Sequence, residues 1–120
     1  MRVGPLKLKA QLCCGDALAM GPGKADLLEA IISEGSISAA GRALGMSYRR
    51  TWMLVDDMNR CWKDRLVETR SGGGRDKGAR VTETGRTVLA AYRALEARLV
   101  SVADDLGILE TLLRELPQTD

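Results

Sequence analysis

The sequence contains no histidine, no phenylalanine and few aromatic residues of any kind, with two Trp and two Tyr among 120 residues. Without histidine the chain lacks the commonest general base and the commonest zinc ligand, and no nucleophile motif takes its place. We therefore expect neither an enzyme nor a metal site, and no cofactor. The three cysteines, Cys13, Cys14 and Cys61, are odd in number and lack metal-ligand spacing, which predicts free thiols.

Long hydrophobic runs are also missing. No window approaches the length of a membrane span, and the N-terminus lacks the apolar core of a signal peptide, so we expect a soluble, cytoplasmic protein. Hydrophobic residues nevertheless make up 45% of the chain, which is enough for a mainly aliphatic core. A length of 120 residues corresponds to one domain, with at most an extension.

Positive charge is concentrated in the middle of the chain. Residues 42–80 carry ten basic and five acidic side chains, a net charge of +5, whereas residues 1–41 are neutral and residues 81–120 have a net charge of −3. Such a basic sector is typical of a protein with an anionic partner. A solvated basic face is the alternative that charge alone leaves open.

The N-terminal residues alternate between apolar and polar side chains. Over residues 5–14 this period of two predicts a half-buried strand, and residues 17–20 are placed to fold back beside it. A helix is then predicted to open in the GPGK sequence at 21–24 and to end at Gly35, because glycine readily adopts the conformation that stops a helix.

Two further helices are predicted on either side of a glycine turn. Ser36 or Ser38 can cap a short second helix, since a side-chain oxygen accepts an unpaired backbone N–H there. Gly45 makes the turn, and Ser47 is positioned to cap a third helix at about 47–62. Three short helices with this tight turn form the helix-turn-helix arrangement, in which the third helix enters the DNA major groove.

The third helix has two sides. Apolar positions four, three and four residues apart predict its buried side: Thr51, Val55, Met58 and Trp62. Polar or large side chains gather on the opposite side, near the N-terminus: Tyr48, Arg49, Arg50 and Met53. Trp52 is expected to pack where this helix meets the following hairpin rather than to touch DNA.

A wing is predicted over residues 66–82. Its strands at 66–70 and 79–82 surround a glycine-rich loop with Arg75 and Lys77, and a hairpin loop of this length is more than a turn. The two basic side chains are expected to reach the minor groove or the DNA backbone. Residues 1–82 would thus form a winged helix-turn-helix domain.

A long helix is predicted from residue 83 to residue 116, capped by Thr82. Its apolar positions recur at alternating spacings of four and three, which is typical of a coiled-coil seam, although Gly107 is a weak point where it can bend or divide. The seam predicts a dimer interface: Val88, Tyr92, Leu95, Leu99, Val102, Leu106, Leu109 and Leu113. An intramolecular core helix is the alternative. The predicted fold class is therefore mainly α with a small β component.

Three stretches together resemble a known family. They are GPGKADLLEAI, GSISAAGRALGMSYRRTWMLVDDMNRCW and LVETRSGGGRDKGARVTETGR, and they resemble the N-terminal winged-helix domain of molybdate-responsive regulators of the ModE type. More broadly they resemble LysR-type DNA-binding domains. The resemblance covers residues 3–95 and places residues 47–50 at the start of the recognition helix and residues 72–78 in the wing.

This resemblance implies a homodimer that binds double-stranded DNA at a palindromic operator near molybdate-transport genes, typically as a repressor. Full-length members continue into oxyanion-binding domains, whereas this sequence stops at Asp120, so we expect no direct oxyanion binding within it. The candidate DNA-binding residues are Ser36, Ser38, Ser47, Tyr48, Arg49, Arg50, Met53, Arg75 and Lys77. The alternative function is an interaction protein whose leucine-rich helix pairs with a different regulator.

Overall fold

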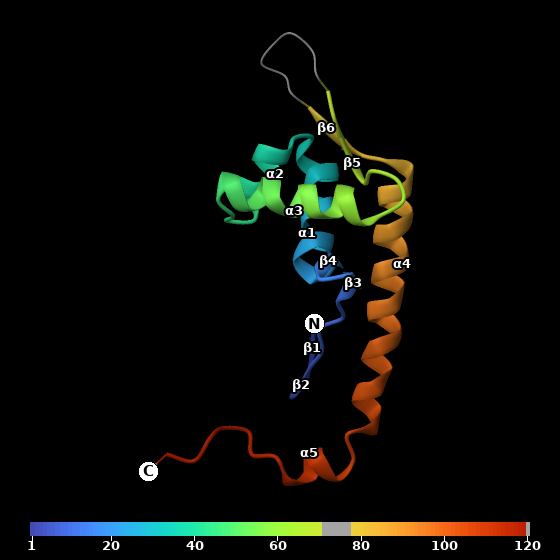
Figure 1. Cartoon of the computed structure of the whole chain (residues 1–120). Helices are drawn as coiled ribbons and strands as arrows, with labels where there is room; N and C mark the ends of the chain where they lie inside the picture. Colours follow the sequence, from blue (N-terminus) through green and yellow to red (C-terminus); the bar gives the residue numbers. More distant parts are fainter. Residues whose placement is uncertain (71–77, 120) are drawn as a thin grey trace.

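The computed structural model describes residues 1–70 and 78–119, so the predicted wing residues Arg75 and Lys77 lie outside the described part. The molecule is elongated, with extents of 61 × 33 × 27 Å. Its length comes from α4 (Glu83–Val100), which leads away from a cluster formed by α1, α2 and α3 (Figure 1). Within the described ranges, no helix combines the length and apolar character needed to cross a bilayer.

The N-terminal residues form two small antiparallel hairpins instead of one long strand. Their strands are β1 (Arg2–Val3), β2 (Leu6–Lys7), β3 (Leu12–Cys14) and β4 (Ala17–Met20). The predicted strand at 5–14 is therefore wrong, whereas the returning strand at 17–20 is confirmed. A tight turn at Gly4, with φ of 57°, joins β1 to β2 in the first hairpin. The carbonyl of Ala10 accepts a hydrogen bond from the Tyr92 hydroxyl at 2.8 Å rather than from a neighbouring strand.

Three helices follow where local signals predicted them. They are α1 (Pro22–Glu34), α2 (Ile37–Ala43) and α3 (Tyr48–Cys61). Gly35 ends α1 with φ of 78°. The Ser36 and Ser47 hydroxyl oxygens accept N–H hydrogen bonds from Ala39 and Arg50, each at 3.1 Å. Both caps are confirmed, and Ser36 rather than Ser38 caps α2.

Helices α2 and α3 approach closely at Gly41. A Cβ atom at this position would overlap the Thr51 hydroxyl oxygen and lie 3.0 Å from Thr51 Cβ, so Thr51 would have to shift. Thr51 is 1% exposed, and its hydroxyl donates to the Ser47 carbonyl at 2.8 Å. The small residue in α2 thus sets how α3 is seated.

The predicted wing strands are confirmed as an antiparallel hairpin of β5 (Val67–Thr69) and β6 (Ala79–Val81). The hairpin projects from the end of the molecule opposite to the C-terminus (Figure 1). Thr82 caps α4 by accepting the Gly85 N–H at 3.0 Å, as predicted. Its hydroxyl also donates to the Arg65 carbonyl at 2.7 Å, which ties the hairpin base to α4.

The core lies between the three helices, β4, the hairpin and the upper part of α4, and it is aliphatic as expected. The largest of its fully buried apolar side chains are Met20, Leu27, Leu28, Ile31, Ile37, Met58, Leu66 and Val67. From α3, the predicted buried residues Thr51, Val55 and Met58 are confirmed.

The prediction of a single continuous helix from residue 83 to residue 116 is wrong. Helix α4 ends at Val100, a 3-10 turn, η1, covers Ser101–Asp105, and the short α5 covers Ile108–Leu112. Gly107 separates η1 from α5 with φ of 51° and ψ of −121°, a conformation that residues with side chains disfavour. The weak point in the sequence is thus a real break.

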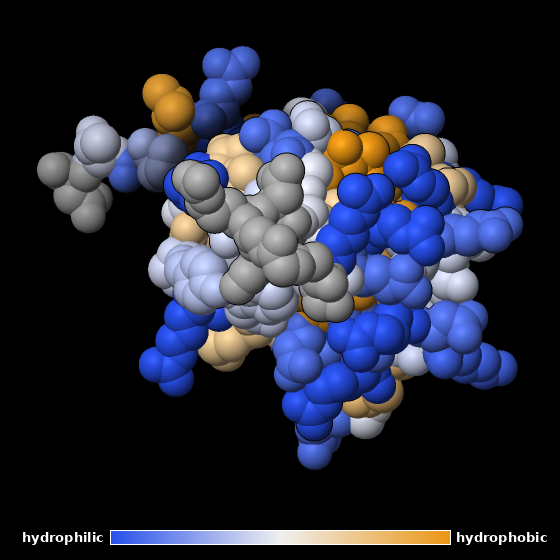
Figure 2. Space-filling view, turned by 90° about the horizontal axis from the view of Figure 1, so that it is seen from above, coloured by the Kyte–Doolittle hydropathy of each residue, from blue (hydrophilic) through white to orange (hydrophobic). Residues whose placement is uncertain are grey.

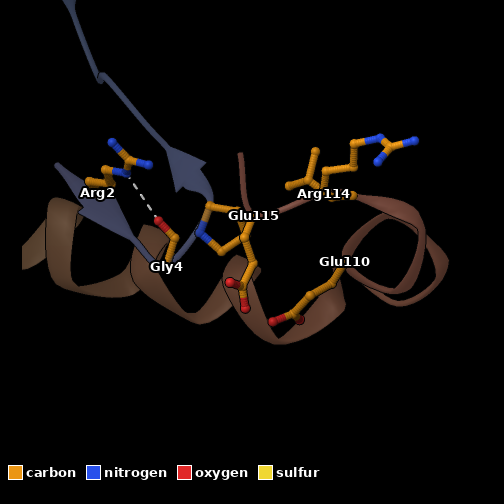
Figure 3. A pocket seen from close by; sticks show the side chains of 7 residues that line it. Arg2, Gly4, Glu110, Arg114 and Glu115 are labelled. Atoms are coloured by element: carbon orange, nitrogen blue, oxygen red, sulfur yellow. Dashed lines mark hydrogen bonds between the residues drawn. The ribbon is translucent and has the colours of Figure 1, made fainter. Parts of the chain in front are cut away.

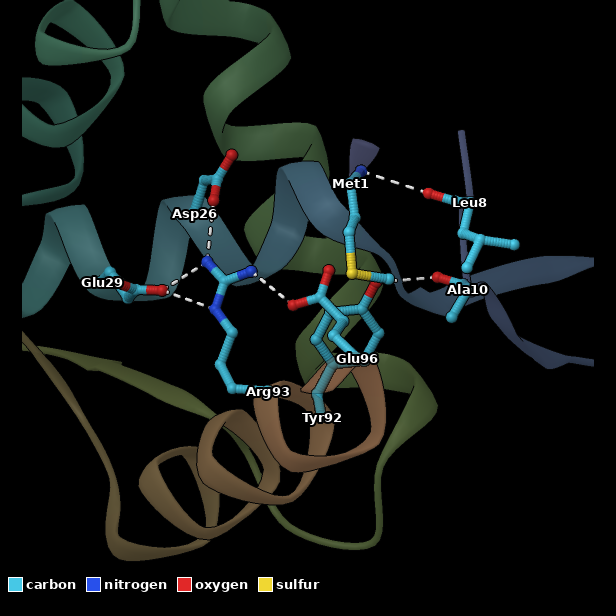
Figure 4. A network of polar contacts seen from close by, with 8 residues as sticks. All are labelled: Met1, Leu8, Ala10, Asp26, Glu29, Tyr92, Arg93 and Glu96. Carbon is cyan, nitrogen blue, oxygen red and sulfur yellow. Dashed lines mark hydrogen bonds and ion pairs between the residues drawn. The ribbon is translucent and has the colours of Figure 1, made fainter. Parts of the chain in front are cut away.

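Helix α4 is fixed to α1 by a polar network (Figure 4). The Arg93 guanidinium donates to Asp26 at 2.7 Å, to Glu96 at 2.8 Å and to Glu29. Burial lowers the Arg93 pKa, but these hydrogen bonds outweigh that effect and raise the pKa overall. Arg93 therefore keeps its charge and holds α4 against the helix cluster.

Candidate nucleic-acid interface

The candidate DNA-binding residues in the first turns of α3 are exposed to solvent. Tyr48 is 68% exposed and Met53 is 57% exposed, and Arg49 and Arg50 are also exposed. Thr51, between them in sequence, points into the core with 1% exposure. The first turns of α3 thus have a buried side, which packs into the core, and an exposed side, which faces solvent.

The surface beside these residues is slightly hollowed. A shallow depression of about 310 Å³ is lined by Ser47, Arg49, Arg50, Met53, Leu54 and Asp57. At its edge the Asp57 carboxylate lies 3.6 Å from the Lys24 ammonium group, whose side chain is only 4% exposed. This ion pair links the beginning of α1 to α3 beside the depression.

The two arginines of the first turn are available to a partner. Within residues 1–70 and 78–119, neither Arg49 nor Arg50 forms an ion pair, whereas Arg60 near the end of the helix pairs with Asp56 at 3.2 Å. A planar guanidinium can donate two parallel hydrogen bonds to guanine O6 and N7 or to a phosphate. The first turn of α3 is therefore suited to an anionic, base-bearing ligand.

The serine residues of the predicted site have structural tasks or are partly covered. The Ser36 and Ser47 oxygens already accept the capping N–H groups, which leaves their hydroxyl hydrogens as donors. Ser38 is half-buried in α2. The unpaired N–H groups at the start of α3 and its helix dipole also favour a phosphate.

The hairpin face of the molecule is largely hydrophilic, and its largest hydrophobic group lies near one edge (Figure 2). Arg80 in β6 pairs with Glu68 in β5 at 2.9 Å, which braces the two strands. Arg70, at the end of the described strand region, is exposed. The hairpin thus adds basic groups beside α3.

Asn59, which is absent from the predicted site, joins α3 to the hairpin. Its Oδ1 accepts the N–H groups of Leu66 and Val67 at 2.9 and 3.0 Å, and its Nδ2 donates to the Val67 carbonyl at 3.1 Å. This amide side chain bonds β5 as a neighbouring strand would. Its signal in the sequence is a polar residue four positions after the buried Val55, on the edge of the apolar stripe.

The predicted dimer seam divides into buried and exposed positions. Tyr92 is 3% exposed and bonded to Ala10, so it is a core residue of the single chain and its place in the seam is corrected. Val88 is half-buried against the core, and Leu99 and Leu106 are also half-buried. The exposed positions are Leu95 (41%), Val102 (45%), Leu109 (68%) and Leu113 (58%).

An apolar groove lies at the upper end of this seam. Its volume is about 350 Å³, and its lining comes from the β3–β4 hairpin, the residue that follows α3, and α4: Leu12, Met20, Trp62, Thr87, Val88, Ala91, Tyr92 and Leu95. Trp62 is held there by its indole N–H, which donates to the Ala19 carbonyl at 3.0 Å. The groove continues the exposed side of α4.

The three cysteines are free thiols, as predicted. Burial raises the pKa of Cys61, and a hydrogen bond with the Cys14 thiol raises it further. Among the described residues, no group of three His, Cys, Asp or Glu side chains is arranged to hold a metal ion.

A further hollow, of about 420 Å³, lies between the β1–β2 hairpin and α5 (Figure 3). It contains the carboxylates of Glu110 and Glu115, while Arg114 points away from them and Arg2 donates to the Gly4 carbonyl at 3.0 Å. Two carboxylates facing this space disfavour an anion there.

The exposed first turn of α3, its seating on α2 through a glycine, and the hairpin bonded to its far end define a winged helix-turn-helix protein. Comparison with known families gives the same class. Residues 24–86 match the model described as "Bacterial regulatory helix-turn-helix protein, lysR family". The chain belongs to this family, and the expectation of a regulator rather than an enzyme is confirmed.

Individual relatives show which members of this broad family the chain is similar to. The chain is 36% identical to the molybdenum-pterin-binding protein MopA of Rhodobacter capsulatus over 92% of its length and 40% of the relative's. It is 41% identical to the molybdenum transport protein ModE of Azotobacter vinelandii over 68% of its length and 30% of the relative's. The resemblance to ModE-type regulators is thus confirmed, and the chain spans less than half the length of these relatives.

A solved structure supports the fold. The full-length LTTR LysG from Corynebacterium glutamicum, with bound effector Arg, is similar to this chain at a TM-score of 0.53 and 26% identity. The similarity covers 78% of this chain and 30% of LysG. The winged-helix fold class is confirmed.

Proposed function

We propose that this chain is a sequence-specific DNA-binding repressor, acting in the cytoplasm on genes for molybdate or other oxyanion transport or for molybdoenzymes. The observation that carries the proposal is the exposed first turn of α3, where Arg49 and Arg50 have no carboxylate partner among residues 1–70 and 78–119. The identity of the regulated genes is inferred from the similarity to MopA and ModE.

In this proposal α3 enters the major groove with its first turn foremost. Arg49 or Arg50 donates to guanine O6 and N7, a contact that discriminates between bases by about 1–3 kcal/mol. The Ser47 and Tyr48 hydroxyls donate to a phosphate or a base edge. The hairpin lies beside α3, bonded through Asn59, and its basic groups contact the backbone or the adjacent minor groove.

We further propose that two copies bind a palindromic operator. Leu95 in α4 and Val102 in the following η1 turn are exposed apolar positions, and in this proposal both pair with the same surface of a second copy. A two-fold dimer presents two α3 helices to two half-sites. The second candidate, pairing with a different regulator through the same side, predicts that the purified chain alone is monomeric in light scattering.

The function is tested by titrating the purified chain against promoter DNA upstream of its own gene and of neighbouring transport genes. Measurements at two salt concentrations separate phosphate contacts from base contacts, because phosphate contacts release counterions. Because we propose that residues 1–120 bind no oxyanion, the affinity should be the same with and without molybdate. Binding to promoter and random DNA with equal affinity would contradict the proposed function.

The matched variants are Arg50→Ala and Arg60→Ala. Arg50→Ala should weaken operator binding by about 1–3 kcal/mol and relax the preference at one base position. Arg60→Ala removes a charge from the same helix, but that charge is paired with Asp56, so the base preferences should persist. An unchanged preference at every base in Arg50→Ala would remove Arg50 from the reading surface.

A further inference from the structure

The two tryptophans of the chain have different surroundings. Trp62 donates its indole N–H to the Ala19 carbonyl and packs against the core. Trp52 is 37% exposed, and its ring centroid lies 6.1 Å from that of Tyr48 at an interplanar angle of 51°. Trp52, expected at the junction with the hairpin, is thus part of an aromatic pair on the first two turns of α3.

The pair lies on one side of the helix. Residues four apart differ by roughly 40° around a helix axis, so Trp52 lies directly behind Tyr48 on the same side. Centroid separations of about 4.5–7 Å with tilted rings are favourable for aromatic pairs. Trp52 therefore favours this tilted orientation of the Tyr48 ring, which is 68% exposed.

An exposed, oriented aromatic ring at this place suits one feature of DNA. Phosphates and most base edges are polar, whereas the C5-methyl group of thymine is the apolar group that the major groove presents. The Tyr48 ring precedes Arg49 and Arg50, whose guanidinium groups suit guanine. An apolar contact and a guanine contact can thus be made to neighbouring bases by a single turn of α3.

Resting on the DNA binding proposed above, we propose that the Tyr48 ring contacts the C5-methyl group of one thymine in each half-site, and that Trp52 is a positioning residue that orients this ring. The pair thereby specifies thymine beside the base read by Arg49 or Arg50. Met53 is the matched comparison on the same helix: it is apolar and exposed, but it lies roughly 140° around the helix from Tyr48.

The test uses duplex DNA selected from a random library by the full chain. Each thymine of the selected site is then replaced by deoxyuridine, which lacks only the methyl group, symmetrically in both half-sites. For the unaltered protein, one position should lose binding by roughly threefold to fivefold per half-site, the loss expected for one buried methyl group. Tyr48→Ala should bind the thymine and deoxyuridine sites equally at that position.

The remaining variants separate orientation from general structure. Tyr48→Phe and Trp52→Phe should retain the thymine preference because an aromatic ring remains at each place. Trp52→Ala should reduce the preference at the Tyr48 position alone, whereas a merely structural role would weaken binding to every site variant equally. Met53→Ala can change the overall affinity, since Met53 is itself a candidate DNA-binding residue, but it should leave the thymine preference at the Tyr48 position intact.

The outcomes distinguish this inference from the proposed function. A selected site whose thymines all tolerate deoxyuridine overturns the inference and leaves DNA binding standing. Retention of the thymine preference in Tyr48→Ala does the same. A library that yields no enriched sequence overturns both, because no specific binding then exists for the pair to refine.

Discussion

The upper and lower parts of the leucine pattern have the same spacing in the sequence and different surroundings in the structure. In α4, Tyr92 is buried with its hydroxyl bonded to Ala10, and Arg93 joins α4 to α1. Beyond Val100, Leu109 and Leu113 are 68% and 58% exposed. A heptad pattern therefore indicates that a helix has an apolar side, while tertiary contacts determine which surface covers that side.

The largest expected effect is the loss of folding stability when the buried Tyr92 side chain is removed. Tyr92→Ala should lower the free energy of unfolding by about 3–5 kcal/mol, as for other large aromatic side chains removed from a core. Leu113→Ala should change the unfolding of the unassociated chain by less than about 0.5 kcal/mol. Urea denaturation followed by circular dichroism at low protein concentration measures both. Equal losses would mean that the two parts of the pattern are covered by the same chain.

An intermediate effect is expected on association. Val102→Asp introduces a charge at an exposed position of the proposed seam, and we expect it to weaken dimerisation by about 2–3 kcal/mol, because a buried unpaired charge is unfavourable. Ser101→Asp is the control, since Ser101 is the exposed neighbour outside the seven-residue spacing. Analytical ultracentrifugation gives both dissociation constants. A Val102→Asp chain that dimerises normally would place the interface elsewhere.

The smallest expected effect is the pH dependence of folding stability that arises from Tyr92 in α4. Burial, and then the nearby Glu96 carboxylate, raise the Tyr92 pKa above its usual value of 10. The folded state therefore favours the neutral phenol, and this contribution is complete below pH 10 and is lost as the pH rises through the folded-state pKa.

The matched variant for this pH dependence is Tyr92→Phe. At neutral pH it should lose about 1 kcal/mol through the missing hydrogen bond to Ala10. Above pH 10 the difference from the unaltered chain should shrink, because only the phenol loses stability there. Chemical denaturation between pH 7 and 11 measures this difference, and a constant gap across the range would show that Tyr92 does not ionise on unfolding.

Local signals made much of the fold predictable. Ser36, Ser47 and Thr82 each bond an N–H three residues later, so the beginnings of three helices depend on neighbours in sequence. Gly35 likewise ends α1 by its own conformation. The exposed residues Tyr48, Arg49 and Arg50 followed from their place opposite the buried stripe of α3.

The rest depended on contacts between distant residues. The alternation over residues 5–14 could not show that Ala10 would bond Tyr92, 82 residues away. Nor could spacing show that the Asn59 amide would bond β5. Gly107 was recognised as a weak point, but the actual break depends on its φ and ψ, which composition does not determine.

The division of α3 between inward and outward side chains has a consequence for how such regulators diversify. Thr51, Val55 and Met58 hold the helix in the protein, while Tyr48, Arg49 and Met53 point away from it. Substitutions among the outward residues change little of what stabilises the fold. Under the proposed function, a duplicated copy of this gene can therefore acquire a new set of target promoters through a few surface changes, while its scaffold is inherited intact.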